Sequence, residues 1–261
     1  MDAAMWVAKT GLDAQQTRMS VLSNNLANVN TTGFKRDRAV FEDLLYQNVR
    51  QAGGQTSADN RAPTGMMIGT GTRVVATEKI HAQGNMITTQ NALDMAINGE
   101  GYFQVLQPDG TLAYTRDGSF KLSATGQIVT ASGALLQPTI VIPPNAQSIT
   151  IGTDGTVTAK IFNSTEQAKL GDVQLARFAN NAGLEPLGQN LFRGTAASGP
   201  AQALKPGLTG AGTVMQGSLE ASNVNVVEEM VNMIETQRAY EVNSKAIAAA
   251  DEMLKFVNNN L

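Results

Sequence analysis

The sequence has no cysteine and one histidine, His81, among its 261 residues. Without cysteine there are no disulfides, no thiolate nucleophiles and no cysteine-bound zinc sites. A single histidine rules out a multi-histidine metal site, and any histidine-based catalytic triad must rest on His81 alone. We therefore expect no metal and no cofactor.

Charge is also scarce. Charged residues make up 16% of the chain, with a net charge of −3, whereas a nucleic-acid-binding protein needs a basic face for phosphate contacts. No run of 18 apolar residues is present, which predicts no membrane insertion. The first residues, MDAAMWVAKTGLDAQQ, lack a basic segment followed by an apolar one, so we expect no cleaved signal peptide.

Glycine and proline avoid the two ends of the chain. All eight prolines lie between Pro63 and Pro206, only Gly11 and Gly33 precede residue 53, and no glycine follows Gly217. Both residue types oppose helix interiors. The distribution predicts helical ends around a non-helical middle.

The N-terminal segment has a seam position every three or four residues, which is polar at Gln15 and apolar at Met5, Ala8, Leu12, Met19, Leu22 and Leu26. This spacing is typical of a coiled-coil seam over about three heptads. An ordinary amphipathic helix packed on its own domain fits the segment equally well. We expect the helix to begin near Asp2 and to end before Thr31.

The C-terminal segment has a similar spacing, and Asn225 with Glu228 has the pattern of a capping box. The predicted helix runs from Val226 to about Val257, roughly 45 Å. A small β domain cannot bury two such helices alone, so we expect their apolar seams to pack on each other or on neighbouring chains. The C-terminal seam residues are Val226, Met230, Met233, Tyr240, Ile247 and Leu254.

The middle of the chain alternates short strand-like runs with turn sequences such as Pro108-Asp109-Gly110 and Asp154-Gly155. Asp-Gly between alternating runs is a strong hairpin signal. We expect an antiparallel all-β domain over 75–205, joined to terminal helices at 1–32 and 221–261 through extended or β connections at 33–74 and 206–220. Residues 47–72 show neither helical nor strand period. The fold class is therefore α+β, with the long terminal α-helices forming a coiled-coil layer.

Several residues invite an enzymatic interpretation, and each has a simpler structural one. Aspartates in predicted turns are expected to bond their own backbone rather than to form a catalytic carboxylate pair. His81 lacks a nucleophile-elbow motif, and Gly69-Thr70-Gly71 and Gly99-Glu100-Gly101 complete no phosphate-binding motif. We therefore expect that the chain is not an enzyme. The aspartates in question are Asp94, Asp109, Asp117 and Asp154.

Two longer motifs carry a family resemblance. Residues 23–35 are SNNLANVNTTGFK, and residues 222–247 are SNVNVVEEMVNMIETQRAYEVNSKAI, followed by DEML at 251–254. They resemble the terminal signatures of bacterial flagellar axial proteins, the family of rod, hook and hook-associated subunits. INGEGYFQVLQPDGTLAYTRDGSF and GTGTRVVATEKIHAQGN are similar to distal rod members of this family, and the likeness covers nearly the whole chain.

The resemblance implies a structural subunit of a straight, hollow, helical drive shaft in the flagellar basal body, spanning the periplasm to the outer membrane. Its implied partners are copies of itself, the proximal rod proteins, the hook protein, the surrounding P and L ring proteins and the flagellar export apparatus. Residues 46–66 correspond to a rod-type stretch that packs between subunits, with Gly53, Gly54, Pro63 and Gly65 as its expected contact positions.

A second hypothesis of a different class stays open: a secreted β-domain binding or fibre module whose helical ends form an oligomerisation stalk. A stalk predicts a closed oligomer in solution. A rod subunit predicts a monomer with mobile ends. The two paired terminal signatures favour the rod subunit.

Overall fold

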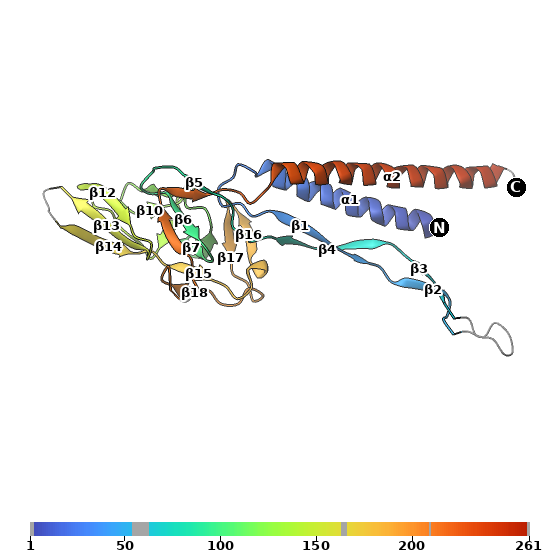
Figure 1. Cartoon of the computed structure of the whole chain (residues 1–261), viewed down its shortest axis with the longest axis horizontal. Coiled ribbons are helices and arrows are strands. Elements are labelled where there is room, and N and C mark those ends of the chain that lie inside the picture. The colour runs from blue at the N-terminus through green and yellow to red at the C-terminus, as the bar shows by residue number, and fades with distance from the viewer. Residues whose placement is uncertain (1–2, 54–62, 163–165, 209, 260–261) are drawn as a thin grey trace. The chain divides into compact units, whose positions relative to one another are not determined.

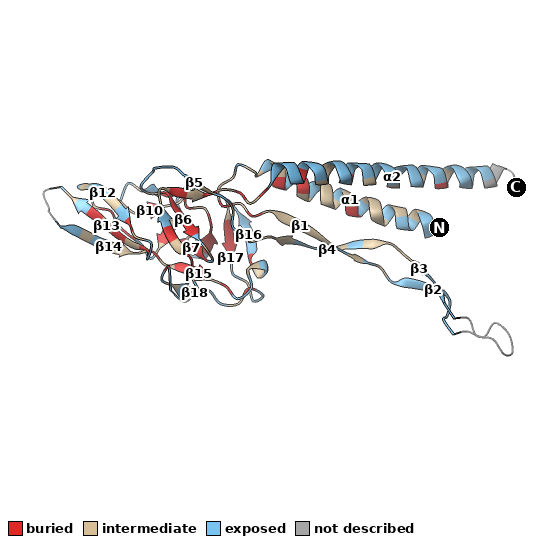
Figure 2. Cartoon of the chain, in the orientation of Figure 1, coloured by how far each residue is buried: buried red, intermediate tan, exposed pale blue. Residues whose placement is uncertain are grey.

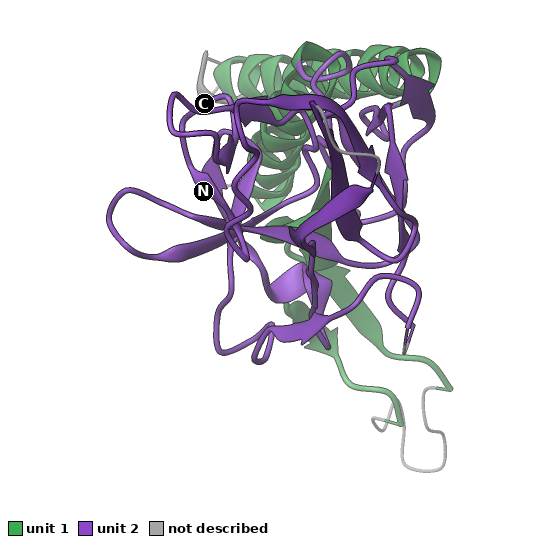
Figure 3. Cartoon of the chain, turned by 90° about the vertical axis from the view of Figure 1, so that its left-hand side faces the viewer, with its two compact units in different colours: residues 1–27, 37–78, 225–261 green, residues 28–36, 79–224 purple. Residues whose placement is uncertain are grey.

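A computed structural model describes residues 3–53, 63–162, 166–208 and 210–259. The chain divides into two compact units, shown in different colours in Figure 3. The helical unit consists of residues 1–27, 37–78 and 225–261, and the β unit of residues 28–36 and 79–224. The predicted α+β class is confirmed, with a mainly β centre and one long helix from each end of the chain.

The helical unit contains two long helices that lie side by side, α1 (Ala3–Ala27) and α2 (Val226–Asn259) (Figure 1). It also contains two antiparallel strand pairs formed by residues that follow α1 in sequence. These are β1 (Asp37–Asp43) with β4 (Thr72–Lys79), and β2 (Tyr46–Arg50) with β3 (Met66–Gly69). One chain supplies one helix pair, so the coiled-coil layer stays a prediction.

The start of α2 has the predicted cap. The Asn225 side-chain oxygen accepts hydrogen bonds from the backbone N–H groups of Val227 at 3.1 Å and Glu228 at 3.5 Å. These N–H groups have no partner inside the helix, so the cap stabilises the first turn by about 1 kcal/mol. Glu228 and Glu229 lie in the same turn, where the helix dipole favours negative charge.

Within residues 47–72, the described residues 47–50 and 66–69 are more regular than their sequence indicates. Gln47 pairs with Ile68 and Asn48 with Met67 in the β2–β3 ladder. Every residue of β2 is exposed, and so are Met66, Met67 and Ile68 of β3. A strand without a buried face has no reason to alternate apolar and polar residues, which explains why the period is missing from the sequence.

The β unit is built from short antiparallel strands. Its largest sheet has the order β16-β17-β8-β7-β11-β10-β9, and β15 pairs with both β7 and β18; a separate meander has the order β12-β13-β14. The strands are β5 (Met86–Thr88), β6 (Met95–Asn98), β7 (Tyr102–Leu106), β8 (Leu112–Thr115), β9 (Lys121–Leu122), β10 (Ile128–Val129), β11 (Leu135–Gln137), β12 (Ala146–Ile151), β13 (Thr156–Ile161), β14 (Gln167–Asp172), β15 (Leu175–Arg177), β16 (Glu185–Gly188), β17 (Leu191–Arg193), β18 (Gln202–Leu204), β19 (Thr213–Gln216) and β20 (Ser218–Glu220), with a short 3-10 helix at Asn181–Gly183.

The predicted turns connect these strands. Pro108-Asp109-Gly110 lies between β7 and β8, and Asp154-Gly155 lies between β12 and β13; both strand pairs are antiparallel. Strands β19 and β20 pair with β6 and β5. The compact β unit therefore includes residues beyond 205, as well as residues 28–36.

The β unit holds the main apolar core, which appears as the buried strands in Figure 2. Phe103 packs edge-to-face on Phe120 at a ring separation of 5.2 Å. Met95, Ile97 and Leu175 are fully enclosed in the same core. Burial of apolar surface on this scale stabilises a unit without help from other chains.

His81 belongs to a second, aromatic cluster in the β unit. Its Nδ1 lies 2.8 Å from the hydroxyl of Tyr102, and its ring packs edge-to-face on Tyr102 and Phe192. Burial, together with the positive charges of Lys35, Lys79 and Arg116, lowers the pKa of His81 from 6.5 to about 4. His81 is therefore a neutral packing residue at neutral pH.

This pKa predicts an acid-sensitive β unit. Between pH 6.5 and 4 the unfolded chain protonates His81 while the folded chain does not, so stability falls as the pH is lowered. We expect His81 to account for a loss of about 2 kcal/mol across this window. Urea unfolding of wild type and His81→Asn at pH 7 and pH 4.5 measures it. If wild type and His81→Asn lose the same free energy of unfolding between pH 7 and pH 4.5, His81 is not the cause of the acid sensitivity.

Candidate assembly surfaces

The contact between α1 and α2 uses mainly small and polar residues. On α2 the least exposed positions recur every three or four residues, at Glu229, Asn232, Thr236, Ala239, Asn243, Ile247 and Ala250. Arg18 of α1 donates a hydrogen bond to the Asn232 side-chain oxygen at 3.4 Å. We call this side of α2 the inner face. It holds the two helices of one chain together.

Gly11 has a packing role in this contact. A side chain at this position would place its Cβ 3.1 Å from Nδ2 of Asn243 on the inner face. That spacing is tighter than ordinary van der Waals contact. The glycine, which weakens an isolated helix by about 1 kcal/mol relative to alanine, lets the two backbones approach closely.

The predicted seam residues are divided between the helix contact and the exposed surface. In α1, Leu22 is buried, and Met5, Leu12, Met19 and Leu26 are half-buried. In α2, Met233 and Ile247 are half-buried, whereas Val226, Met230, Tyr240 and Leu254 are exposed. The role of these residues in assembly stays a prediction.

A second apolar track runs along the opposite side of α2. Val227 lies nine residues before Thr236, about two and a half turns, so the two point in opposite directions. Successive members lie on one side of the helix, and Figure 2 shows how much of α2 is exposed. Arg238 and Lys245 interrupt the track. We call it the outer stripe: Val227, Val231, Ile234, Val242, Met253 and Phe256.

The sequence contains a signal for the outer stripe that the seam analysis missed. Its positions also follow intervals of three and four when Arg238, Lys245 and Ala249 are counted, but the track begins one residue later than the predicted seam. Two interleaved tracks both satisfy the period. Only the position of α1 shows which side of α2 is already covered. Exposure is high at both ends of the stripe, 70% at Val227 and 71% at Phe256.

The β2–β3 pair presents a further apolar surface, which we call the hairpin surface. Its members are exposed although they are large and apolar, and Leu45 reaches 89% exposure. Successive strand residues point to opposite faces, so both faces of the hairpin carry exposed apolar side chains. Exposed apolar surface of this kind marks sites of protein association. The hairpin surface consists of Leu45, Tyr46, Val49, Met66, Met67 and Ile68.

The structure accounts differently for the four contact positions predicted near this hairpin. Gly53 has a φ of +79° and open space around it, and Pro63 is exposed. At Gly65 a Cβ would lie 2.8 Å from the Ala52 nitrogen and the Arg50 oxygen, so glycine is required by the hairpin itself. Gly54 lies outside the described residues.

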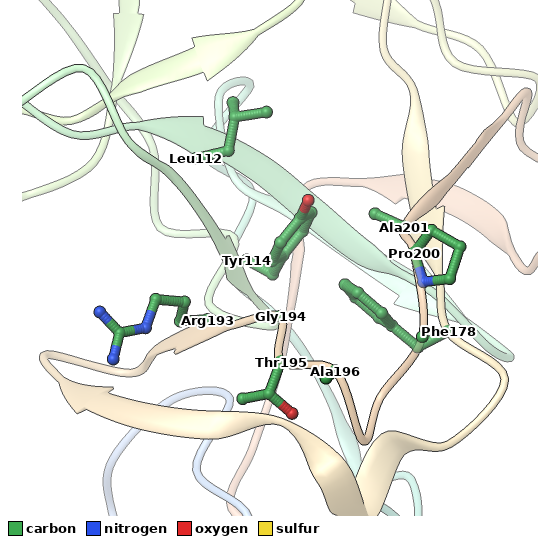
Figure 4. A pocket seen from close by; sticks show the side chains of 10 residues that line it. Leu112, Tyr114, Phe178, Arg193, Gly194, Thr195, Ala196, Pro200 and Ala201 are labelled. Carbon is green, nitrogen blue, oxygen red and sulfur yellow. The ribbon is translucent and has the colours of Figure 1, made fainter.

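A cleft of about 400 Å³ lies on the β unit, over Tyr114 and Phe178 (Figure 4). Arg193, at its edge, pairs with Glu185 at 2.6 Å, and the Thr195 hydroxyl donates to the Gly183 carbonyl at 2.6 Å. Both groups are thus engaged in holding the local fold. The cleft brings no general base next to a nucleophile, so its geometry favours packing over catalysis.

The aspartates considered as catalytic candidates bond to their neighbours in sequence. Asp109 accepts the backbone N–H of Thr111 at 2.9 Å, and Asp154 accepts that of Thr156 at 3.1 Å. Hydrogen bonds from these threonines lower the pKa of both carboxyl groups. Among the described residues, no three His, Cys, Asp or Glu side chains are grouped to hold a metal ion. No described helix is long and apolar enough to cross a membrane.

Comparison with known proteins shows the class of protein to which the chain belongs. The family model "Flagella basal body rod protein" matches residues 5–35. "Flagellar hook protein FlgE/F/G D1 domain" matches residues 96–159, and "Flagellar basal body rod FlgEFG protein C-terminal" matches residues 215–260. The chain has the organisation of a flagellar rod or hook protein along its length.

Individual relatives narrow the class to one family. The flagellar basal-body rod protein FlgG of Buchnera aphidicola from Schizaphis graminum is 55% identical over 255 residues, covering 98% of both chains. FlgG of Borreliella burgdorferi is 48% identical over 99% of this chain and 98% of its own, and FlgG of Bacillus subtilis is 40% identical over 96% of each. The chain belongs to the FlgG family of flagellar basal-body rod proteins. It is a structural subunit of the flagellar rod.

The burial of Leu22 inside one chain makes a testable prediction. Leu22→Ala should destabilise the helical unit of the dilute monomer by about 2–5 kcal/mol, because it leaves a cavity between helices. The exposed seam residue Leu254 is the matched control, and Leu254→Ala should cost little. Urea unfolding followed by circular dichroism at 222 nm measures both variants. Equal, small effects would mean that Leu22 becomes fully packed only between chains.

Proposed function

We propose that the chain polymerises with copies of itself into the distal rod, a straight, rigid, hollow helical filament that transmits motor torque to the hook and lets exported subunits pass. Its further partners are the proximal rod proteins below, the hook protein above, the P and L rings around it and the flagellar export apparatus. It functions between the periplasm and the outer membrane.

The outer stripe of α2 is the observation that carries this proposal. The inner face already contacts α1, so the stripe needs a partner outside its own helix pair. A helix that packs on α1 with one side and is apolar on the opposite side is suited to lie between neighbours. When such a contact repeats between different surfaces and does not close into a ring, it produces an open helical filament.

The hairpin surface supports a second contact in the same filament. A wedge of exposed apolar side chains between stacked subunits resists sliding, which a straight shaft must prevent. The hairpin is held in place within the helical unit, where the Thr10 hydroxyl accepts the backbone N–H of Thr72 at 3.3 Å. A cavity of about 300 Å³ lined by Trp6, Val7 and Ile68 adds an apolar recess beside the hairpin.

The stalk hypothesis makes a different prediction about association. A stalk would bury the outer stripe in a closed oligomer of fixed size. The open filament adds subunits above a critical concentration. Sedimentation velocity over a concentration series separates them: a constant oligomer supports the stalk, and a monomer followed by long polymers supports the rod.

The outer stripe can be tested by making it polar without disturbing the helix. The triple variant Val231→Gln, Ile234→Gln, Val242→Gln removes about 1 kcal/mol of apolar burial per site, and glutamine favours helix. We expect the critical concentration for polymerisation to rise about a hundredfold. Ser244→Gln, at an exposed position on a different side of the same helix, is the matched control. Unchanged polymerisation of the triple variant would rule out the stripe as a subunit contact.

The hairpin can be tested by deleting residues 48–64. We expect the β unit to stay folded and the polymers to become curved or flexible, because the steric block to sliding is gone. Electron micrographs give the persistence length. A chain in which the same residues are replaced by an equally long Gly-Ser segment is the control, and it should also give flexible polymers. Straight, stiff polymers from both chains would show that the segment is an ordinary surface loop.

A further inference from the structure

The chain passes between the two units four times, after Ala27, Arg36, Glu78 and Val224. Covalent links alone would leave such passages free to bend and twist. Buried polar side chains, which are uncommon in a protein interior, are found beside these passages in both units.

In the helical unit this cluster is centred on Asn25, which is 1% exposed. Its side-chain nitrogen donates to the Asp37 carbonyl at 2.9 Å, and its oxygen accepts the Asp37 N–H at 2.8 Å. The same nitrogen donates to Oε2 of Glu229 on α2 at 3.1 Å. Asn25 thus holds together three segments that lead into passages. We call Asn25, Asp37 and Glu229 the helix-side clamp.

In the β unit the corresponding cluster is centred on Glu220. Its Oε1 accepts hydrogen bonds from Nζ of Lys35 at 2.5 Å and from the backbone N–H of Gly84 at 2.9 Å. Its Oε2 lies 3.4 Å from Nη1 of Arg116. The Lys35 ammonium also donates to the Ala82 carbonyl at 2.8 Å. We call Lys35, Arg116 and Glu220 the β-side clamp; all three side chains are buried.

Asn223 reinforces the same three segments of the β unit. Its side-chain oxygen accepts the backbone N–H of Arg36 at 2.8 Å, and its nitrogen donates to the Ile80 carbonyl at 2.8 Å. The Gly33 N–H donates to the Glu220 carbonyl at 2.8 Å. Segments 33–36, 80–84 and 220–223 are therefore cross-linked by directional bonds where they lead to or from passages.

Stability alone does not account for these charges. A buried ion pair recovers little more than its desolvation cost, and apolar residues of the same volume often serve as well. What charge-assisted hydrogen bonds add is fixed direction and distance. Only Arg36 separates Lys35 of one clamp from Asp37 of the other. The two clamps are thus joined through a single residue.

We propose that the helix-side and β-side clamps act as a torque joint: each clamp locks, within its own unit, the segments that lead into passages, so that load on the terminal helices does not unwind the ends of the β unit. This inference rests on the proposed function as a drive shaft. It assigns Lys35, Glu220 and Asn25 as positioning residues. It also gives a physical role to the terminal signatures, because Asn25, Lys35 and Glu229 belong to them.

The joint is tested with Lys35→Met combined with Glu220→Gln. This pair removes both charges, so the net charge of the cluster is unchanged, and glutamine keeps the size of the glutamate side chain. The matched control is Arg193→Met with Glu185→Gln, which removes an exposed pair of the same unit. Asn25→Leu tests the helix-side clamp independently if the first variant fails to fold.

Hydrogen exchange of the dilute full-length monomer is the first measurement. We expect protection at Gly33, Gly84 and Ala221 to fall at least tenfold in the double variant, with protection at Phe103 unchanged. The control should match wild type at all four positions. Unchanged exchange at Gly33, Gly84 and Ala221 would overturn the proposal.

Swimming of cells that carry each chain, in media of increasing viscosity, is the second measurement. We expect normal swimming at low viscosity and at least a twofold larger loss of speed at high viscosity for the double variant. Altered exchange with wild-type swimming at every viscosity would overturn the mechanical role. Failure of the wild-type chain to polymerise would instead refute the proposed function, while leaving the exchange result to test the clamps by itself.

Discussion

The structure depends on a helix that has more apolar surface than its own chain covers. One side of α2 packs on α1 mainly through small and polar residues, and the outer stripe stays in contact with water. Apolar surface of this extent is costly in a monomer and favourable in an assembly. In the proposed filament, neighbouring subunits cover the stripe, and the burial of its apolar surface would then favour assembly.

The β unit, in contrast, covers its apolar surface with its own side chains. Its core is closed by side chains such as Phe103, Phe120 and Leu175, so it needs no neighbour to be stable. One chain therefore combines a self-sufficient unit with one whose apolar surface is completed by association. This division suits a subunit that must remain soluble before assembly and become rigid afterwards.

The terminal signatures acquire a chemical meaning from the fold. Asn25 and Glu229 are more than 200 residues apart, yet they share a buried hydrogen bond at 3.1 Å. Lys35 and Glu220 form a buried ion pair across a similar separation in sequence. Such pairs constrain residue identity strongly, since the loss of one partner leaves the other buried and unsatisfied. The signature residues in these pairs thus belong to the clamps and not to the apolar seam.

The sequence by itself determined the α+β class, the two terminal helices, the Asn225 cap and the turns of the β unit, because these depend on local rules of spacing, capping and turn chemistry. Its terminal motifs were sufficient to indicate the family. Only the tertiary structure decided which side of α2 is covered, since two interleaved tracks satisfy the same period. It also decided that residues 46–50 and 66–69 are strands, because a hairpin exposed on both faces shows no alternation. The partners of Lys35 and Asn25 were likewise invisible in the sequence, because pairing across some 200 residues follows from the path of the chain and not from any local pattern.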